Sequence, residues 1–227
     1  MKSYRPVVAR LLEEKRPTTV LDAPCGSGWL AGLVQFDCSL DGVDLVGAAP
    51  AGYRGFRHAD LDCGLPDDLG QYHAIVCCEG LEHLGNPHLF LRSAYRHLQA
   101  AGMLVVTTPN VWYPASRLQY LWRGFFPGFP SLAGKIQRGS HMHVTPWSFP
   151  QLYLYLSLAG FTSIRLHDVP EARPKRLYEW LLGLPQHLYC ASKARRSASD
   201  VERAYWQQAG SRQSIFGRRL VASAMRA

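Results

Sequence analysis

The sequence predicts an α/β domain with a doubly wound, mostly parallel seven-stranded sheet. Short apolar runs typical of strands alternate with helical or loop segments along most of the chain. The run YHAIVCC at residues 72–78 is apolar over nearly its whole length, as a parallel strand buried on both faces should be. A glycine-rich turn follows the first predicted strand, a position that usually holds a nucleotide.

The regular part of the pattern covers the first half of the chain. A helix is expected at residues 4–15, because the apolar residues there recur at helical spacing behind Pro6. The elements that follow are strands at 18–22, 40–44, 55–60, 72–78 and 103–107, with helices at 29–36 and 87–98.

Two inserts interrupt this pattern in the second half. Residues 110–146 form a long, aromatic connection with several prolines and glycines, typical of a lid or substrate loop. A helix at 148–159, capped by Ser148, and a strand at 161–169 come next, and helical pieces at 173–208 precede a last strand at 216–224. We expect a single domain over residues 1–227, with these parts: a core at about 17–169, a last strand at about 216–225, an aromatic insert at about 110–146 and a helical insert at about 170–214.

The charge is concentrated near the end of the chain. Residues 173–227 hold 11 Lys and Arg against 3 Asp and Glu, which accounts for the whole net charge of +8. Such a basic segment either attracts an anionic membrane surface, an acidic glycolipid or a nucleic acid, or is a solvated helical face. The six cysteines form no CxxC pair, and neither a signal peptide nor a membrane-spanning run is evident, so we expect a cytoplasmic protein with reduced thiols.

The glycine turn LDAPCGSGWLAG, at residues 21–32, distinguishes between two kinds of nucleotide. Its spacing is GxGxxxG, one residue longer than the dinucleotide fingerprint GxGxxG. Asp22 stands directly before the loop, where its charge would repel a pyrophosphate but would suit an ammonium group. S-adenosylmethionine carries such a group on its amino-acid part, and glycines let the backbone approach it closely. Asp44 and Asp60 end the next two strands, where acids can accept hydrogen bonds from ribose hydroxyls and from the adenine amino group.

Several motifs in order resemble those of class I S-adenosylmethionine-dependent methyltransferases of the ubiquinone/polysaccharide type, which have a Rossmann-like fold. The matching segments are VLDAPCGSG, GVDL, HADLDCGLP, AIVCCEGLEHLGNPHLFL, QAAGMLVVTTPN and HVTPWSFPQLYLYLSLAGF, between residues 20 and 161. CCEG departs from the family, which often has a more aliphatic residue before the glutamate, and the long insert before the last strand is not explained by the resemblance.

The resemblance implies a set of cofactor contacts. The residues implied to line the methionine part are Asp22, Ala23, Cys25, Gly26 and Gly28. Those implied for the ribose, the adenine and the surroundings of the sulfonium are Asp44, Leu45, Asp60, Leu61, Cys78 and Glu79. Asp44 and Asp60 could instead cap strand ends, and Cys78 could be a packed thiol.

Methyl transfer to an alcohol needs a group that takes the hydroxyl proton, and a general base contributes roughly 10²- to 10⁴-fold to such a step. His143 is the first candidate, because it lies between the variable loop and a helix, and His83 and His141 come next. Each of these histidines could instead have a structural role or be exposed to solvent. We predict no metal site, because Glu79 and Asn110 would offer only one charged ligand.

The acceptor is less constrained by the sequence. CEGL stands where nucleobase amino methyltransferases carry D/N-P-P-Y/F, which argues against a base or nucleic acid as the substrate. Asn110, Trp112 and Tyr113 begin the aromatic insert and are the expected acceptor contacts, although the aromatic side chains could simply pack the loop onto the sheet. The layout resembles methyltransferases of bacterial surface-polysaccharide assembly, which suggests O-methylation of a sugar hydroxyl at the cytoplasmic membrane face. The alternatives are a phenolic or quinone-type acceptor, or a non-catalytic cofactor-binding module that docks to a membrane or partner.

Overall fold

The computed structural model describes residues 2–129 and 142–227, so the candidate base His141 lies outside the described residues. Seven strands form one sheet: β1 (Thr19–Asp22), β2 (Ser39–Asp44), β3 (Gly55–His58), β4 (Tyr72–Cys78), β5 (Leu98–Pro109), β6 (Thr162–Leu166) and β7 (Arg219–Met225). Their order is β3-β2-β1-β4-β5-β7-β6. Only β7 runs antiparallel to its neighbours among these strands, which confirms the predicted doubly wound, mostly parallel sheet.

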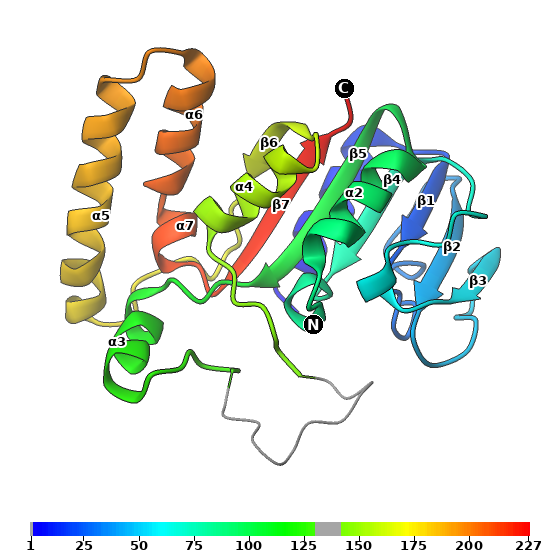
Figure 1. The fold of residues 1–227 in the computed structure, drawn as a ribbon, viewed down its shortest axis with the longest axis horizontal. Coiled ribbons are helices and arrows are strands. Elements are labelled where there is room, and N and C mark those ends of the chain that lie inside the picture. Colours follow the sequence, from blue (N-terminus) through cyan, green and yellow to red (C-terminus); the bar gives the residue numbers. More distant parts are fainter. Residues whose placement is uncertain (1, 130–141) are drawn as a thin grey trace.

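Helices cover both faces of the sheet. The helices are α1 (Arg5–Lys15), α2 (Pro87–His97), α3 (Pro114–Arg123), α4 (Phe149–Leu158), α5 (Leu177–Arg195), α6 (Asp200–Ala209) and α7 (Arg212–Phe216), with short 3-10 turns η1 (Leu61–Cys63) and η2 (Leu81–His83). α2 and α4 lie in front of the sheet in Figure 1, α5 and α6 pair as a hairpin at one side, and α3 lies below the start of α5. No helix among the described residues is both long enough and apolar enough to span a bilayer.

The core consists of two apolar layers separated by the sheet. One layer contains Phe90 of α2 together with Trp147 and Phe149 at the start of α4, all fully buried. The other layer is built on α1, whose residues Val8 and Leu12 are also fully buried. Two buried layers around one sheet are the expected solution for an α/β chain of this length.

The helix expected at residues 29–36 is wrong. Leu33 and Val34 both donate to the carbonyl oxygen of Leu30, at 3.0 and 3.1 Å, which closes only a single turn. Gly32 at the centre of this stretch costs about 1 kcal/mol relative to alanine in a helix. A segment this short also needs tertiary packing to be helical, so the chain passes to β2 through turns instead.

The two inserts carry helices of their own. The aromatic insert contains α3, which ends at Gly124 in a left-handed conformation. The helical insert contains α5, α6 and α7 between β6 and β7. Ser148 caps α4 as predicted, because its hydroxyl accepts the backbone N–H of Gln151 at 3.4 Å.

Candidate functional site

The predicted cofactor residues lie at the carboxyl ends of β1, β2, β3 and β4. In an open α/β sheet, ligands bind at this edge, near the point where the strand order reverses. That point lies between β1 and β4 here, because β1 pairs with β2 on one side and with β4 on the other. The loop after β1 is tied to β2 by a backbone hydrogen bond of 3.0 Å from Cys25 to Val43.

Asp22 is the most unusual residue of this edge. Its side chain is fully buried, and Oδ2 accepts a hydrogen bond from the hydroxyl of Tyr53 at 2.5 Å. Oδ1 has no hydrogen-bond partner among the described residues. Burial raises the pKa of Asp22 to about 7, the nearby charge of Asp44 adds to this, and the bond from Tyr53 opposes it. A buried carboxylate oxygen without a donor is the acceptor that an ammonium group would satisfy.

The two glycines of the loop have different roles. Gly26 has φ +53°. A Cβ added at this position would have no protein atom within 4 Å, so the space beside Gly26 is open. Gly28 has φ +73°, and a Cβ there would lie 2.2 Å from the Cβ of Pro50. Gly28 is therefore required for packing against the loop between β2 and β3, whereas the space beside Gly26 is open.

Asp44 and Asp60 have different partners. Asp44 Oδ2 accepts the N–H of Gly26 at 2.8 Å, and Oδ1 accepts that of Val46 at 3.2 Å. A carboxylate has about four acceptor positions, so Asp44 can still accept from ribose hydroxyls. Asp60 caps η1, because its Oδ1 accepts the N–H of Asp62 at 3.0 Å. This is a turn role of the kind considered above as the alternative to adenine binding.

The remaining predicted cofactor residues differ in exposure. Ala23, Cys25, Leu61 and Cys78 are buried, and the side chain of Leu45 is 46% exposed. Burial raises the pKa of the Cys25 thiol to about 12 and that of Cys78 well above its ordinary value, so both are neutral packing groups.

Glu79 is held by two cations. It has φ +52°, uncommon outside glycine, and its N–H is held by the backbone oxygen of Thr107 at 2.9 Å. Glu79 Oε2 lies 3.4 Å from Nζ of Lys2 and 3.7 Å from Nε of Arg219. These partners come from the two ends of the chain, so no local signal in the sequence points to them.

Two of the three histidines expected to act as bases, His83 and His143, lie together next to Glu82. The ring centroids of His83 and His143 are 5.0 Å apart. Nε2 of His83 lies 4.0 Å from Oε1 of Glu82, whose side chain is 1% exposed. Burial raises the pKa of Glu82 to about 8, and the charge of Glu79 adds to this. We call these three residues, Glu82, His83 and His143, the His–Glu cluster.

Hydrogen bonds hold the His–Glu cluster in place from several sides. The backbone oxygen of Glu82 accepts the N–H groups of Val144 and Thr145, at 2.7 and 3.0 Å, so η2 fixes the segment that carries His143. The hydroxyl of Thr108, at the end of β5, donates to Oε2 of Glu82 at 3.1 Å. The sequence pointed to His83 and His143 as candidate bases, but it gave no sign of the contribution of Thr108.

The expected acceptor contacts Asn110, Trp112 and Tyr113 organise the aromatic insert. Asn110 is buried, and its amide donates to the backbone oxygens of Ser214 and Gly217 at 3.0 and 2.7 Å and accepts from the N–H of Trp112 at 2.9 Å. Its side chain therefore joins the aromatic insert to the turn before β7.

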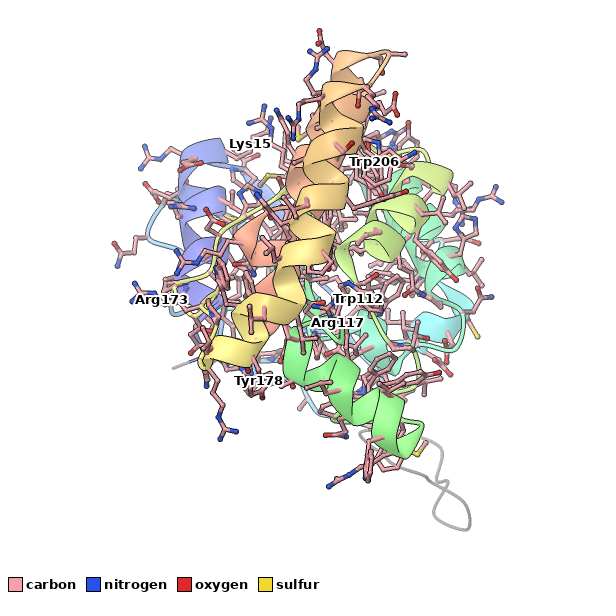
Figure 2. All side chains as sticks on the ribbon, turned by 90° about the vertical axis from the view of Figure 1, so that its left-hand side faces the viewer. Lys15, Trp112, Arg117, Arg173, Tyr178 and Trp206 are labelled. Carbon is pink, nitrogen blue, oxygen red and sulfur yellow. The ribbon has the colours of Figure 1, made fainter. Side chains whose placement is uncertain are left out.

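Trp112 and Tyr113 connect the aromatic insert to the helical insert and to β7. The indole N–H of Trp112 donates to Oε1 of Gln186 on α5 at 2.8 Å, and the guanidinium of Arg218 stacks on Tyr113 at 4.4 Å. Figure 2 shows Trp112 and Arg117 where α3 meets α5. The two inserts thus form one wall beside the carboxyl edge.

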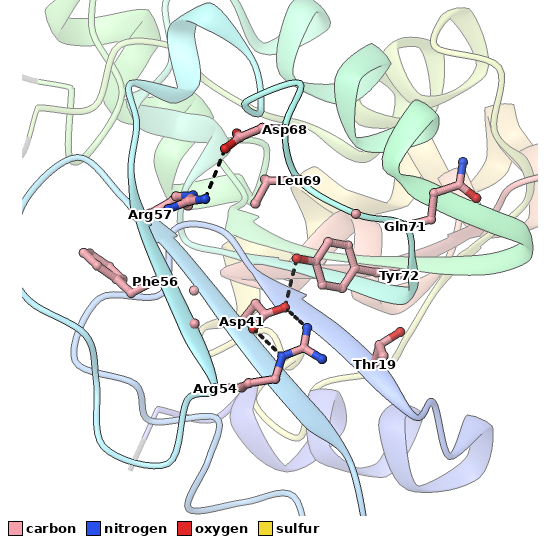
Figure 3. Close-up of a pocket in the computed structure, with 12 residues that line it drawn as sticks. Thr19, Asp41, Arg54, Phe56, Arg57, Asp68, Leu69, Gln71 and Tyr72 are labelled. Carbon is pink, nitrogen blue, oxygen red and sulfur yellow. Dashed lines mark hydrogen bonds and ion pairs between the residues drawn. The ribbon is translucent and has the colours of Figure 1, made fainter.

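A separate pocket lies at the opposite, amino-terminal edge of the sheet (Figure 3). Its charged groups pair with one another: Asp41 bonds both Arg54 and the hydroxyl of Tyr72, and Arg57 bonds Asp68 at 3.1 Å. None of the residues predicted to bind the cofactor lines this pocket.

The chain is similar to known methyltransferases in sequence and in fold. Residues 2–166 match the protein family described as methyltransferase domain. The chain belongs to this family. A curated relative, the ubiquinone biosynthesis O-methyltransferase of Pseudomonas paraeruginosa, is 30% identical over 106 residues, which cover 40% of this chain and 44% of that enzyme. The chain thus spans less than half the length of that relative.

Solved structures of methyltransferases share the fold. A SAM-dependent methyltransferase of Thermotoga maritima has a TM-score of 0.60 and 15% identity, and the alignment covers 99% of this chain and 88% of that one. The N-terminal domain of EvdMO1, solved in the presence of SAH and D-fucose, has a TM-score of 0.51 and 18% identity over 74% of this chain and 77% of that one. These findings confirm the predicted family, the class I S-adenosylmethionine-dependent methyltransferases.

Proposed function

We propose that this methyltransferase transfers the methyl group of S-adenosylmethionine to a hydroxyl oxygen, with a sugar of a surface glycan or glycolipid as the acceptor. The observation that carries the oxygen acceptor is the His–Glu cluster at the carboxyl ends of β4 and β5. An alcohol must lose its proton as it accepts a methyl group, and this cluster brings two imidazoles and a carboxylate together near the cofactor residues. The curated relatives also methylate oxygen, as their name states.

Each part of the carboxyl edge has a distinct task in this proposal. When bound, S-adenosylmethionine supplies a methyl group on a sulfonium, which leaves as a neutral thioether. Asp22 receives the ammonium of the cofactor at its free Oδ1, and Gly26 leaves room for the amino-acid part. Asp44 receives the ribose hydroxyls. The protein mainly aligns the acceptor oxygen with the methyl carbon and excludes water from that line.

Two acceptor classes compete. The aromatic insert supports a sugar acceptor, because the partly exposed rings of Trp112 and Tyr113 each carry a guanidinium over one face, that of Arg117 and that of Arg218. The printed name of the curated relatives favours a phenolic, quinone-type acceptor instead. Both are hydroxyl acceptors, so the same cluster would serve either one.

The test is release of S-adenosylhomocysteine by the purified protein with hydroxylated glycans and with catechol-type phenols. We expect turnover with a glycan acceptor, and His143→Ala should abolish it while binding of S-adenosylhomocysteine persists. His73→Ala is the matched control, because His73 lies at the amino end of β4, on the far edge of the sheet. Turnover with phenols alone would identify the second acceptor class. Cofactor binding without turnover on any acceptor would favour the non-catalytic module.

The proposal includes contact with an anionic membrane surface. Large apolar side chains are exposed on the last part of α3 and on the first half of α5, and we call them the α3–α5 surface: Tyr120, Leu121, Trp122, Leu177, Trp180 and Leu181. Leu121 and Trp122 are 82% and 89% exposed. Arg123, Lys175 and Arg176 flank these side chains in the sequence. Apolar residues beside cations are typical of surfaces that dock on anionic bilayers.

Co-sedimentation with vesicles tests this contact. We expect salt-sensitive binding to vesicles that contain anionic lipid and weaker binding to neutral vesicles, because each cation near the surface contributes about 1 kcal/mol. The double substitution Leu121→Ser and Trp122→Ser should abolish binding. Val201→Ser on α6 removes a residue that is also exposed, at 71%, but lies outside the α3–α5 surface, and it should have no effect. Membrane docking would be refuted if Val201→Ser lost vesicle binding as fully as the double variant, or if the wild type did not bind vesicles at all.

A further inference from the structure

Tyr53 reaches the carboxyl edge of the sheet from the loop between β2 and β3. Its hydroxyl donates to Oδ2 of Asp22 at 2.5 Å, across 31 positions of the chain. It is the one hydrogen-bond donor to this carboxylate among the described residues, since Oδ1 has no partner there. A carboxylate that is fully buried has lost its hydration, so the bond from Tyr53 is the compensation that the fold provides.

The ring of Tyr53 packs against two glycines. A Cβ on Gly28 would lie 3.1 Å from Cε2 of the ring, and a Cβ on Gly42 of β2 would lie 3.1 Å from Cδ1, so a side chain at either position would press on the ring. The backbone beside the ring is also tied to β2, because the N–H of Arg54 donates to the oxygen of Leu40 at 2.7 Å. Ring packing and backbone pairing therefore hold the hydroxyl in place independently of its bond to the carboxylate.

The other groups that face Asp22 do not favour its charged form. Asp44, at the end of β2, brings a second negative charge, which adds to the effect of burial and favours the protonated acid. Three thiols also lie near this carboxyl group, those of Cys25, Cys77 and Cys78. Burial raises the pKa of each thiol, so they stay neutral. Burial also raises the pKa of Tyr53, and the charge of Asp22 adds to this, so the hydroxyl keeps its proton and stabilises the carboxylate as a donor.

We propose that Tyr53 is a positioning residue for the cofactor: its hydroxyl holds Oδ2 of Asp22 and stabilises the carboxylate, so that Oδ1 can accept the ammonium group of S-adenosylmethionine. This deepens the proposed function, because it rests on the ammonium contact of Asp22, but it does not depend on the acceptor. Tyr53 acts through Asp22. Without the hydroxyl, the carboxyl group should keep its proton to higher pH, and a protonated carboxyl group does not attract an ammonium group.

Calorimetric titration of Tyr53→Phe with S-adenosylhomocysteine at pH 7.5 and pH 9.0 tests this role, because the substitution keeps the ring and removes only the hydroxyl. Loss of a hydrogen bond to a charged group should raise the midpoint of the carboxyl titration by about 1–2 pH units. Starting from the pKa of about 7 for Asp22, the variant should bind about 3- to 25-fold more weakly than the wild type at pH 7.5. At pH 9.0 its affinity should lie within about two-fold of the wild type, and comparison at the same pH cancels the ligand's own titration.

Two further proteins control this measurement. Tyr72→Phe is the matched control, because the hydroxyl of Tyr72 donates to Asp41 at 3.0 Å on the opposite edge of the sheet, and this variant should bind as the wild type does at both pH values. In the background of Asp22→Asn, Tyr53→Phe should cause no further loss of affinity, because Tyr53 acts through the carboxylate. Infrared spectroscopy follows the protonated carboxyl band of Asp22 without any ligand, and its midpoint should rise in Tyr53→Phe. Circular dichroism establishes that each variant is folded.

The outcomes separate the role of Tyr53 from the proposed function. An equal loss of affinity at pH 7.5 and pH 9.0 in Tyr53→Phe, or wild-type affinity at both, would overturn the positioning role. A further loss in the double variant, or an unchanged infrared midpoint, would overturn it as well. If Asp22→Asn binds S-adenosylhomocysteine as the wild type does, the ammonium contact itself fails and the role of Tyr53 falls with it. If Asp22→Asn binds weakly but Tyr53→Phe binds normally, the contact stands and only the role of Tyr53 is refuted. Methyl transfer enters none of these measurements.

Discussion

Binding of the cofactor should depend on pH through Asp22. Its carboxyl group is fully buried, and its pKa is raised to about 7. Only the ionised form attracts an ammonium group, so the protein must release this proton before it binds the amino-acid part of the cofactor. S-adenosylhomocysteine carries the same amino-acid part without the sulfonium, and it is therefore the simplest probe.

The magnitude follows from the titration. A group with a pKa of about 7 is about 9% ionised at pH 6.0 and about 76% ionised at pH 7.5. Affinity scales with the competent fraction, so the dissociation constant should be about eight-fold larger at pH 6.0 than at pH 7.5. Asp22→Asn removes the charge, and losing a hydrogen bond to a charged group costs about 1.5–3 kcal/mol. Asp22→Asn should bind S-adenosylhomocysteine roughly 10- to 150-fold more weakly than the wild type at pH 7.5, and its affinity should depend little on pH.

The free energy of unfolding should fall as the pH rises, whereas cofactor affinity should increase. For an acid whose pKa is raised on folding, the native state binds the proton more tightly than the unfolded chain. Stability is therefore lost as the pH rises from the unfolded pKa toward the folded one. The rise from 3.8 to about 7 corresponds to about 4 kcal/mol, which is an upper value for what Asp22→Asn could restore above pH 7. Near pH 4, Asp22→Asn should change the free energy of unfolding little.

The assay is calorimetric titration with S-adenosylhomocysteine between pH 6.0 and 7.5, together with urea unfolding at pH 4 and pH 8. Asp67→Asn is the matched control, because the side chain of Asp67 is 95% exposed. An affinity that is flat with pH in the wild type would refute the reasoning. So would an Asp22→Asn variant with wild-type affinity, because the buried carboxylate would then not be the partner of the ammonium group.

The loop and the insert provide two further predictions. Gly26→Ala should weaken binding of S-adenosylhomocysteine and cost about 1–2 kcal/mol in backbone strain. Gly28→Ala should lower the free energy of unfolding by more than that, because its Cβ would also meet the Cβ of Pro50 at 2.2 Å. Equal free energies of unfolding for the two variants would contradict this. Asn110→Ala should destabilise the chain by about 2–4 kcal/mol in urea, since three hydrogen bonds of a buried amide are lost; a change below about 0.5 kcal/mol would show that these bonds do not hold the aromatic insert.

Local patterns were sufficient for the sheet and for the edge at which the predicted cofactor residues lie. Strand residues alternate with crossovers in a fixed order, and the parallel arrangement then places the acids that follow β1, β2 and β3 at one edge. Asp22 and Asp44 follow from this reasoning, since each ends its own strand. The helix at 29–36 could not be decided in the same way, because a short segment with a central glycine depends on packing.

The acceptor side required the tertiary structure. Glu82 and His83 stand in the sequence motif, but His143 joins them only because the N–H groups of Val144 and Thr145 bond the backbone oxygen of Glu82. His83 and His143 are 60 residues apart in the chain, so no local sequence pattern predicts their contact.

The sequence by itself determined the order of the strands along the chain, the glycine loop and the positions of the acids that we propose as cofactor contacts, because these depend on periodicity and on neighbours in the chain. Only the tertiary structure decided that Tyr53 donates to one oxygen of Asp22, while the other has no hydrogen-bond partner among the described residues. It also decided that two histidines and a buried glutamate converge beside β5. Burial and long-range hydrogen bonds set these features, and neither is a property of a short stretch of residues.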